Sequence, residues 1–143
     1  MELRNAKGDD VGKIITLLRE CNLPTEDILP EKIFFKLIAD RASNVIACAG
    51  FESYHDQGLF RSFAVHPSRQ KMGLGKVILG ALELEARQVG IKQFHLLTNT
   101  AESYFLSKGF LISQRTEAPL SIQLTSEFTS MCPASAVYMT KII

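Results

Sequence analysis

Hydrophobic residues follow two different periods along the chain, and the change of period marks the limits of the predicted elements. From Val11 to about Cys21, and again from Gly73 to about Gln88, apolar residues recur every three to four positions, which predicts two helices. Shorter runs rich in β-branched and aromatic residues, bounded by turn residues, predict strands. These runs lie at residues 2–6, 33–39, 44–54, 59–65, 91–98 and 136–143, and a further one starts at 110. The pattern predicts a mixed α/β domain.

The connections between these runs indicate how the strands pair. Short turns join the three runs between residues 33 and 65, which favours antiparallel pairing. A helix separates the runs at 59–65 and 91–98, and such a crossover favours parallel pairing. Thr25 is a candidate cap for a short helix that ends near Pro30, and another helix is expected from 100 to 107. Residues 115–133 form a long polar connection with one short helical turn, and long ordered connections are often functional.

The segment from Val65 to Lys76 joins an apolar strand to a helix through a glycine-containing turn. Pro67 ends the strand because proline has no N–H for the ladder. Gly73 and Gly75 lack Cβ atoms, so the backbone N–H groups at the start of the helix can approach an anion closely. This predicts a cradle for a diphosphate, the alternative being that the glycines only shape the turn. A dinucleotide loop would need a third glycine where Ile78 stands, and the Gly-Lys-Ser/Thr of a Walker loop is missing.

Length and composition restrict the class of protein. The 143 residues suffice for one domain, taken as residues 1–143, and a net charge of +1 gives no reason to expect a nucleic-acid partner. No apolar run reaches the ~20 residues of a membrane span, and the first residues lack the features of a secretory signal, so a cytoplasmic protein without membrane contact is expected. The three cysteines are far apart and lack C-x-x-C spacing, which argues against disulfides and a metal site.

Several motifs together resemble those of the GNAT acetyltransferase superfamily. Gln70-x-x-Gly73-x-Gly75 resembles its Q/R-x-x-G-x-G/A motif, which binds the pyrophosphate of acetyl-CoA through backbone amides. Val65-His66-Pro67 is similar to the end of the superfamily's fourth strand, and residues 101–110 resemble its late signature A-x-x-x-Y-x-K-x-G-F. The run from Thr125 to Met139 resembles a narrower subgroup, the arsenic-resistance-associated N-acetyltransferases of ArsN type.

This resemblance implies an α/β (α+β) fold with a mixed, mostly antiparallel central sheet. The sheet is expected to have six or seven strands, to splay between the fourth and fifth strands, and to be flanked by about four helices. The pantetheine arm of the cosubstrate acetyl-CoA would lie in the gap like an added strand, and the pyrophosphate would lie at the glycine turn. The cofactor-binding residues implied are Phe63, Ala64, Val65, Gln70, Lys71, Met72, Gly73, Leu74, Gly75, Lys76, Thr98 and Asn99.

Acetyl transfer to an amine needs a neutral nucleophile, donors for the developing oxyanion and a proton for the departing thiolate. In the family a tyrosine on the late helix often gives that proton. Alignment of Ala101 and Gly109 puts Phe105 at the tyrosine position and Tyr104 one residue earlier. One residue is a turn of ~100° on a helix, so Tyr104 is a candidate catalytic residue without the family's geometry. The alternatives are a core tyrosine in this position and a proton from Ser103 or water.

Arg61 stands inside an apolar strand, where an arginine is costly unless it is paired. Regular alternation would put it on one face with Leu59, Phe63 and Val65. Its planar fork suits a carboxylate, phosphinate or arsinate group of an acceptor, which makes it the candidate substrate-binding residue. The alternative is an internal salt bridge with Glu52, and the two interpretations are compatible if Glu52 is the general base.

The sequence therefore predicts an N-acetyltransferase that moves acetyl from acetyl-CoA directly to a primary amine of a small molecule. An amino acid or an acidic amino-acid analogue is the expected acceptor. The alternative is an acyl-CoA-binding sensor or a non-catalytic module, which Phe105 favours. The resemblance also suggests a homodimer. Cys132 invites a hypothesis of arsenic ligation, but a packed thiol is the simpler interpretation.

Overall fold

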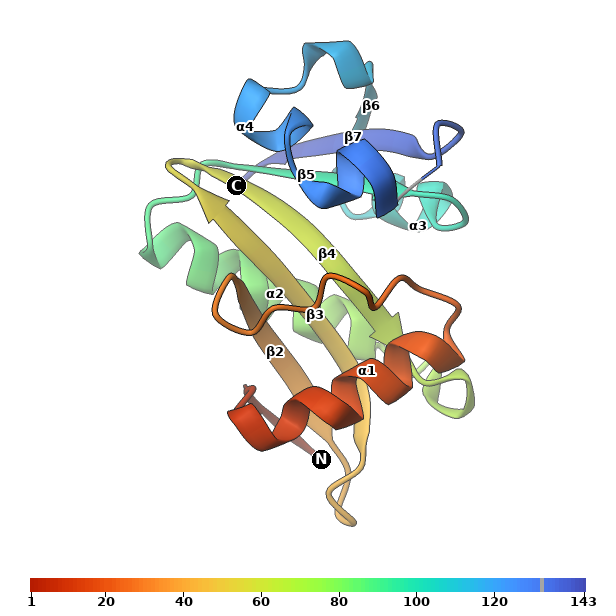
Figure 1. The fold of residues 1–143 in the computed structure, drawn as a ribbon. Helices are drawn as coiled ribbons and strands as arrows, with labels where there is room; N and C mark the ends of the chain where they lie inside the picture. Colours follow the sequence, from red (N-terminus) through yellow and green to blue (C-terminus); the bar gives the residue numbers. More distant parts are fainter. Residues whose placement is uncertain (132) are drawn as a thin grey trace.

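The computed structural model describes residues 1–131 and 133–143, whose strands form one mixed sheet (Figure 1). The strands in this part of the chain are β1 (Glu2–Asn5), β2 (Ile33–Ala39), β3 (Val45–Tyr54), β4 (Gln57–Val65), β5 (Gln93–Thr98), β6 (Leu111–Ser113) and β7 (Val137–Ile142). Their order in the sheet is β1-β2-β3-β4-β5-β7-β6. Neighbouring strands are antiparallel except β4 and β5, which are parallel. The predicted fold class and the parallel crossover are confirmed.

Helices cover both faces of the sheet. They are α1 (Val11–Glu20), α2 (Leu74–Gln88), α3 (Glu102–Ser107) and the single turn α4 (Leu120–Gln123). Figure 1 shows α1 on one face of strands β2 to β4 and α2 on the opposite face. None of the helices in the described residues is long and apolar enough to cross a membrane.

Each face has its own apolar core. On the α1 face, Ile14, Leu17 and Leu18 pack against strand residues such as Leu37 and Cys48. The α2 face is larger and rich in aromatic residues. Its buried members include Ile78, Leu82, Phe60, Phe94, Phe105 and Phe110. Burying such side chains contributes about 1.5–3 kcal/mol each, which is why the periodic segments of the sequence form these elements.

The predicted short helix after Thr25 is wrong. No helix forms between Glu20 and Ile33, and this segment instead crosses the sheet as an irregular loop (Figure 1). Asp27 in its middle makes hydrogen bonds to Arg61 of β4, which a local helix pattern gives no means to foresee. The polar connection after β6 contains α4 and a π-helical turn at Glu127–Met131, called η4 here.

Two irregularities open the sheet at β4. The ladder between β4 and β5 ends at the pair Leu59–His95, although both strands continue beyond it, so the predicted splay is present. A β-bulge lies between the pairs Gly50–Arg61 and Cys48–Ala64, where Ser62 has a positive φ of 56°. The extra residue interrupts the regular alternation of side chains, so residues after the bulge point to the opposite face of the sheet from the one that strict alternation would give.

The bulge corrects one prediction. Arg61 lies on the α1 face, where it meets the loop after α1, whereas Phe63 joins the aromatic core on the α2 face. The expected common face for Arg61 and Phe63 is therefore wrong. Ser62 is a small polar residue between Arg61 and Phe63, and it lies at the bulge.

Candidate active site

The turn after β4 leaves the start of α2 open to a ligand. Gly73 precedes the helix with φ 79°, a left-handed conformation that favours glycine. The N–H of Val77 is bonded to the carbonyl oxygen of Gly73 at 3.2 Å, so the N–H groups before Val77 have no partner within the helix. No side chain of a described residue caps them. Gln70 closes the turn by donating to the carbonyl oxygen of Val65 at 3.2 Å.

Tyr104 of α3 lies beside this helix end. Its ring stacks on Phe63 with centroids 5.6 Å apart, and a Cβ atom at Gly75 would lie 2.6 Å from its hydroxyl oxygen. Gly75 is thus required by packing as well as by its place at the helix start. The hydroxyl is buried and has no hydrogen-bond partner among the described residues. Burial raises the pKa of Tyr104, so it stays protonated and able to donate.

A buried hydroxyl without a partner costs about 1–3 kcal/mol, so a ligand that accepts a hydrogen bond at this point would recover that cost. The helix end beside it favours an anion. Both features fit the phosphate or amide oxygens of acetyl-CoA. Phe105, at the position where the resemblance places a tyrosine, is instead part of the aromatic core.

The other predicted cofactor-binding residues surround the same gap. Lys71, Met72 and Lys76 are exposed around the turn, and Lys71 has a positive φ of 68°. Across the gap, the hydroxyl of Thr98 accepts the N–H of Ala101 at 3.0 Å and so holds the start of α3, while Asn99 is exposed. Ala64 and Leu74 are buried, so they offer backbone rather than side-chain contacts.

Arg61 forms the centre of a buried charged cluster on the α1 face. It is 3% exposed. Its Nη1 and Nη2 donate to the two carboxylate oxygens of Asp27 at 2.7 and 2.5 Å, and Nη1 also donates to Glu52 at 2.7 Å. Its Nε donates to the hydroxyl of Ser62 at 3.1 Å. The salt bridge with Glu52 that the sequence left as an alternative is therefore present.

A third carboxylate, that of Glu127 in η4, lies 3.7 Å from the Nε of Arg61. Asp27, Glu52 and Glu127 together carry three negative charges against one guanidinium, so the cluster is not neutral when all are ionised. Burial raises the pKa of Glu127 to about 7, because Arg61 only partly offsets it and Asp27 and Glu52 add repulsion. Burial acts on Asp27 too, but its bonds from Arg61 and Ser126 outweigh it and lower its pKa.

The cluster ties together three separate parts of the chain. Asp27 comes from the loop after α1, Glu127 from the connection between β6 and β7, and Glu52 from the end of β3. Ser126 donates to Asp27 and so links the two loops directly. Tyr54 donates to Glu52. Glu52 and Tyr54 also line a cavity of about 570 Å³ between residues 30–34 and 51–54.

The Arg61 cluster and the start of α2 lie near the same strand, β4, a few residues apart. Arg61 stands two residues beyond the last β4–β5 pair, and Val65 ends the strand next to the glycine turn. Four residues of strand span roughly 13 Å at about 3.3 Å per residue. The open edge of β4 therefore leads from a helix end suited to an anion to a cluster of carboxylates.

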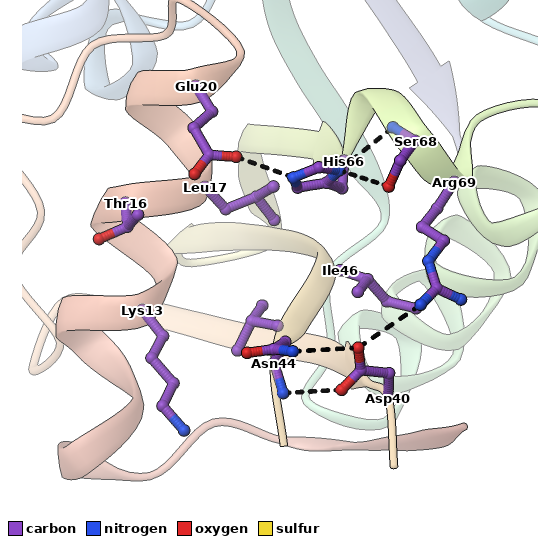
Figure 2. A pocket seen from close by; sticks show the side chains of 11 residues that line it. Lys13, Thr16, Leu17, Glu20, Asp40, Asn44, Ile46, His66, Ser68 and Arg69 are labelled. Atoms are coloured by element: carbon purple, nitrogen blue, oxygen red, sulfur yellow. Dashed lines mark hydrogen bonds and ion pairs between the residues drawn. The ribbon is translucent and has the colours of Figure 1, made fainter. Parts of the chain in front are cut away.

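A second polar cleft, of about 390 Å³, lies elsewhere, between α1, the β2–β3 turn and the turn after β4 (Figure 2). Most of its polar side chains interact with one another, and the amine of Lys13 donates to the carbonyl oxygen of Ser43 at 3.0 Å. His66 lies 3.0 Å from Glu20 and Arg69 lies 3.5 Å from Asp40. None of the predicted site residues lines it. His66 also accepts the backbone N–H of Ser68, which makes it a cap of the turn.

Sequence reasoning missed Asp27 and Glu127. The buried arginine was the available signal, because such a residue demands carboxylate partners. The sequence does not identify these carboxylates, since Asp27 and Glu127 both lie in irregular segments far from Arg61 in the sequence. Cys132, proposed as an arsenic ligand or a packed thiol, lies outside the described residues.

Comparison with known proteins agrees with the geometry. Residues 30–111, more than half of the chain, match the family described as "Acetyltransferase (GNAT) domain". The chain belongs to the GNAT acetyltransferase family. Acetyltransferases of this family use acetyl-CoA as their cosubstrate.

Curated GNAT relatives include the amino-acid acetyltransferase of Pasteurella multocida, 31% identical over 127 residues, which covers 82% of this chain and 28% of that protein. The amino-acid acetyltransferase of Yersinia pseudotuberculosis is 28% identical over 132 residues, covering 85% of this chain and 30% of that protein. The chain thus spans less than a third of the length of these relatives.

Solved structures share the fold of this GNAT chain. N-acetylglutamate synthase from Neisseria gonorrhoeae, complexed with coenzyme A and N-acetyl-glutamate, superposes with a TM-score of 0.83 at 20% identity, covering 99% of this chain and 34% of that one. A GNAT-family acetyltransferase from Staphylococcus aureus Mu50 gives 0.78 at 14% identity, covering 99% and 98%.

Proposed function

We propose that this chain is an N-acetyltransferase that transfers acetyl from acetyl-CoA directly to the primary amine of a small molecule. One observation carries the proposal: the open edge of β4 connects a helix end suited to an anion with a buried cluster of carboxylates. The first feature suits the cosubstrate, and the second suits an amine. Family membership supports the same reaction.

The chain's own residues would hold the cosubstrate mainly by backbone. The N–H groups of Leu74, Gly75 and Lys76 would face the pyrophosphate, and the strand edge from Phe63 to Val65 would face the pantetheine arm. The bound thioester supplies an activated acetyl group. The hydroxyl of Tyr104 would donate either to an oxygen of the cosubstrate or to the departing sulfur, because no described residue takes its hydrogen bond.

We further propose that Arg61 organises the site and does not bind an acidic group of the acceptor. Four of the five N–H groups of its guanidinium already donate, to Ser62, to Glu52 and twice to Asp27. Glu52 would then take part in the acceptor site from its place between Arg61 and Tyr54.

An amino acid is the first acceptor to test, because the relatives named above are amino-acid acetyltransferases. The ArsN-type resemblance stays a prediction, and it adds phosphinate and arsinate amino-acid analogues to the panel.

The test measures release of the CoA thiol from acetyl-CoA with amino acids, these analogues, diamines and short peptides. Turnover with at least one amine, confirmed by the mass of the N-acetylated product, is the expected result. Acetyl-CoA binding without turnover for any amine would contradict the proposal and favour the sensor that Phe105 suggests.

A further inference from the structure

We propose that the Arg61 cluster is the binding site of the acceptor's amine, that the amine enters as an ammonium ion, and that Glu127 takes its proton. This inference rests on the proposed acetyl transfer and adds the residue that activates the nucleophile. It also restricts the class of acceptor.

The balance of buried groups is the first argument. Three carboxylates surround one guanidinium, and all four groups are largely buried. A buried charge without a counter-ion is costly. A second cation would remove this imbalance, and an ammonium ion also brings three N–H donors to carboxylate oxygens that lack them. Arg61 occupies the centre of the cluster, so the cation must enter at its periphery.

The state of Glu127 is the second argument. Asp27 accepts hydrogen bonds from Arg61 and Ser126, and Glu52 accepts them from Arg61 and Tyr54. Glu127 is 6% exposed, yet no described residue donates a hydrogen bond to it, and its contact with Arg61 is a 3.7 Å ion pair. It is the member of the cluster whose oxygens are left for a ligand.

The electrostatic surroundings of Glu127 suit it to exchange a proton near neutral pH. The charged groups that face it are Arg61 of β4, Asp27 of the loop after α1 and Glu52 of β3, with the neutral hydroxyl of Tyr54 beyond Glu52. Burial and the two carboxylates raise its pKa to about 7 against the opposing effect of Arg61. A general base works best when its pKa lies near the working pH.

The proton transfer balances as follows. The ammonium group gives one proton to the carboxylate of Glu127 and becomes a neutral amine. The lone pair of its nitrogen forms a C–N bond with the acetyl carbon, the C–S bond breaks, and the sulfur keeps that electron pair. A second amine proton ends on the sulfur, and Glu127 returns its proton to solvent.

The excess of carboxylates over cations in the Arg61 cluster should also discriminate between acceptors by their charge. A carboxylate beside the reacting amine, as in the α-amino group of glutamate, would be repelled by Asp27, Glu52 and Glu127. An amine remote from any carboxylate, as in a diamine or the side chain of lysine, would not be repelled. The structure therefore favours cationic acceptors over acidic ones.

The experiment compares the pH dependence of kcat/KM for the wild-type chain and Glu127→Gln with 1,4-diaminobutane, lysine and glutamate. The wild type should prefer diaminobutane or lysine over glutamate at least tenfold, and kcat/KM should rise as the pH passes about 7. In Glu127→Gln, kcat/KM at pH 7 should be about 100-fold lower than in the wild type, as expected for a lost general base. The increase of kcat/KM near pH 7 should also be absent. The matched control is Glu117→Gln, an exposed residue of the same connection, which should behave as the wild type.

Calorimetric binding of acetyl-CoA to each variant shows whether the fold is intact. If Glu127→Gln fails to bind, Glu127→Asp serves in its place and should keep the rise near pH 7 with a lower kcat. An active wild type with an unchanged profile in Glu127→Gln would overturn the role of Glu127 and leave the acetyl transfer standing. Preference for glutamate would overturn the amine site. Inactivity with every amine of the wider panel would overturn both proposals.

Discussion

Arg4 and Arg61 each form a bidentate salt bridge with an aspartate, but in different surroundings. Arg4 donates to Asp10 at 2.7 and 2.9 Å, and Arg61 donates to Asp27 at 2.7 and 2.5 Å. The Arg4 side chain is 26% exposed and that of Arg61 is 1% exposed. Arg4 has one further carboxylate partner, that of the exposed Glu2, 3.5 Å from its Nε, and its hydrogen bonds to Asp10 help to lower the pKa of Asp10 to about 2. Arg61 has two further carboxylate partners, and both are buried.

The two arginine sites differ in whether all of their buried carboxylates have hydrogen-bond donors within the described part of the chain. Asp10 also accepts the N–H of Lys7 at 2.7 Å, so its hydrogen bonds serve the entry to α1. The hydroxyl of Tyr104 is buried without a hydrogen-bond partner among the described residues. Glu127 is buried with an ion pair of 3.7 Å to Arg61 and without a hydrogen-bond donor among the described residues. In the proposed reaction both would contact a substrate. Unsatisfied polar groups are rare in folded proteins, and they concentrate at functional sites.

The largest effect is expected from removing the two arginines in turn. Arg61→Met leaves three buried carboxylates without a cation and should lower the free energy of unfolding by about 3–5 kcal/mol. Arg4→Met leaves one buried carboxylate that keeps a backbone donor, and should cost roughly 1–3 kcal/mol. Urea unfolding measures both. Equal losses would contradict the distinction between the two pairs.

The buried His95 has hydrogen-bond partners at both ring nitrogens, and its contribution to the free energy of unfolding depends on pH. His95 of β5 lies between Tyr138, 2.7 Å from its Nδ1, and Gln57, 2.5 Å from its Nε2, and burial lowers its pKa to about 4. The unfolded chain binds a proton at ~6.5, so this contribution to stability is complete above pH 6.5 and is lost as the pH falls toward 4.

The expected loss is on the order of 2 kcal/mol. The free energy of unfolding of the wild type and of His95→Gln should therefore converge between pH 6.5 and 4. A constant difference across that range would show that His95 is not buried in its neutral form.

A methyl group at Gly75 tests the contact between the helix end and Tyr104. Gly75→Ala puts a Cβ atom 2.6 Å from the hydroxyl oxygen and 3.0 Å from Phe63, so either the helix end or the Tyr104 ring must shift. Acetyl-CoA affinity should fall at least tenfold, or about 1.4 kcal/mol. Gly80→Ala is the matched control, since its Cβ meets nothing within 4 Å, and should leave affinity unchanged in calorimetry.

The smallest effect is expected at the hydroxyl of Tyr104. Tyr104→Phe removes a group that the fold leaves unsatisfied, so the free energy of unfolding should stay the same or rise, while acetyl-CoA binding weakens about threefold. Tyr138→Phe removes a satisfied hydroxyl bonded to His95 and should cost about 1 kcal/mol without changing acetyl-CoA binding. The opposite pattern would show that Tyr104 serves only the core.

The sequence predicted the fold and the cofactor turn better than the acceptor site, for a physical reason. The strands and long helices carry periodic patterns of apolar residues, and the glycine turn is encoded within a few residues of Gln70 and Gly73. The bulge at Ser62 turns Phe63 away from Arg61, and strand periodicity does not reveal it. Asp27 and Glu127 lie 34 and 66 positions from Arg61, in loops whose positions only the whole fold determines.

The Arg61 cluster holds more buried negative charge than Arg61 neutralises. A carbon-13 NMR titration of the Glu127 side-chain carboxyl tests it most directly, with Glu117 as the exposed reference. We expect a pKa of about 7 for Glu127. A pKa near the ordinary value of about 4.3 would contradict this expectation, because Arg61 would then be sufficient to keep all three carboxylates ionised.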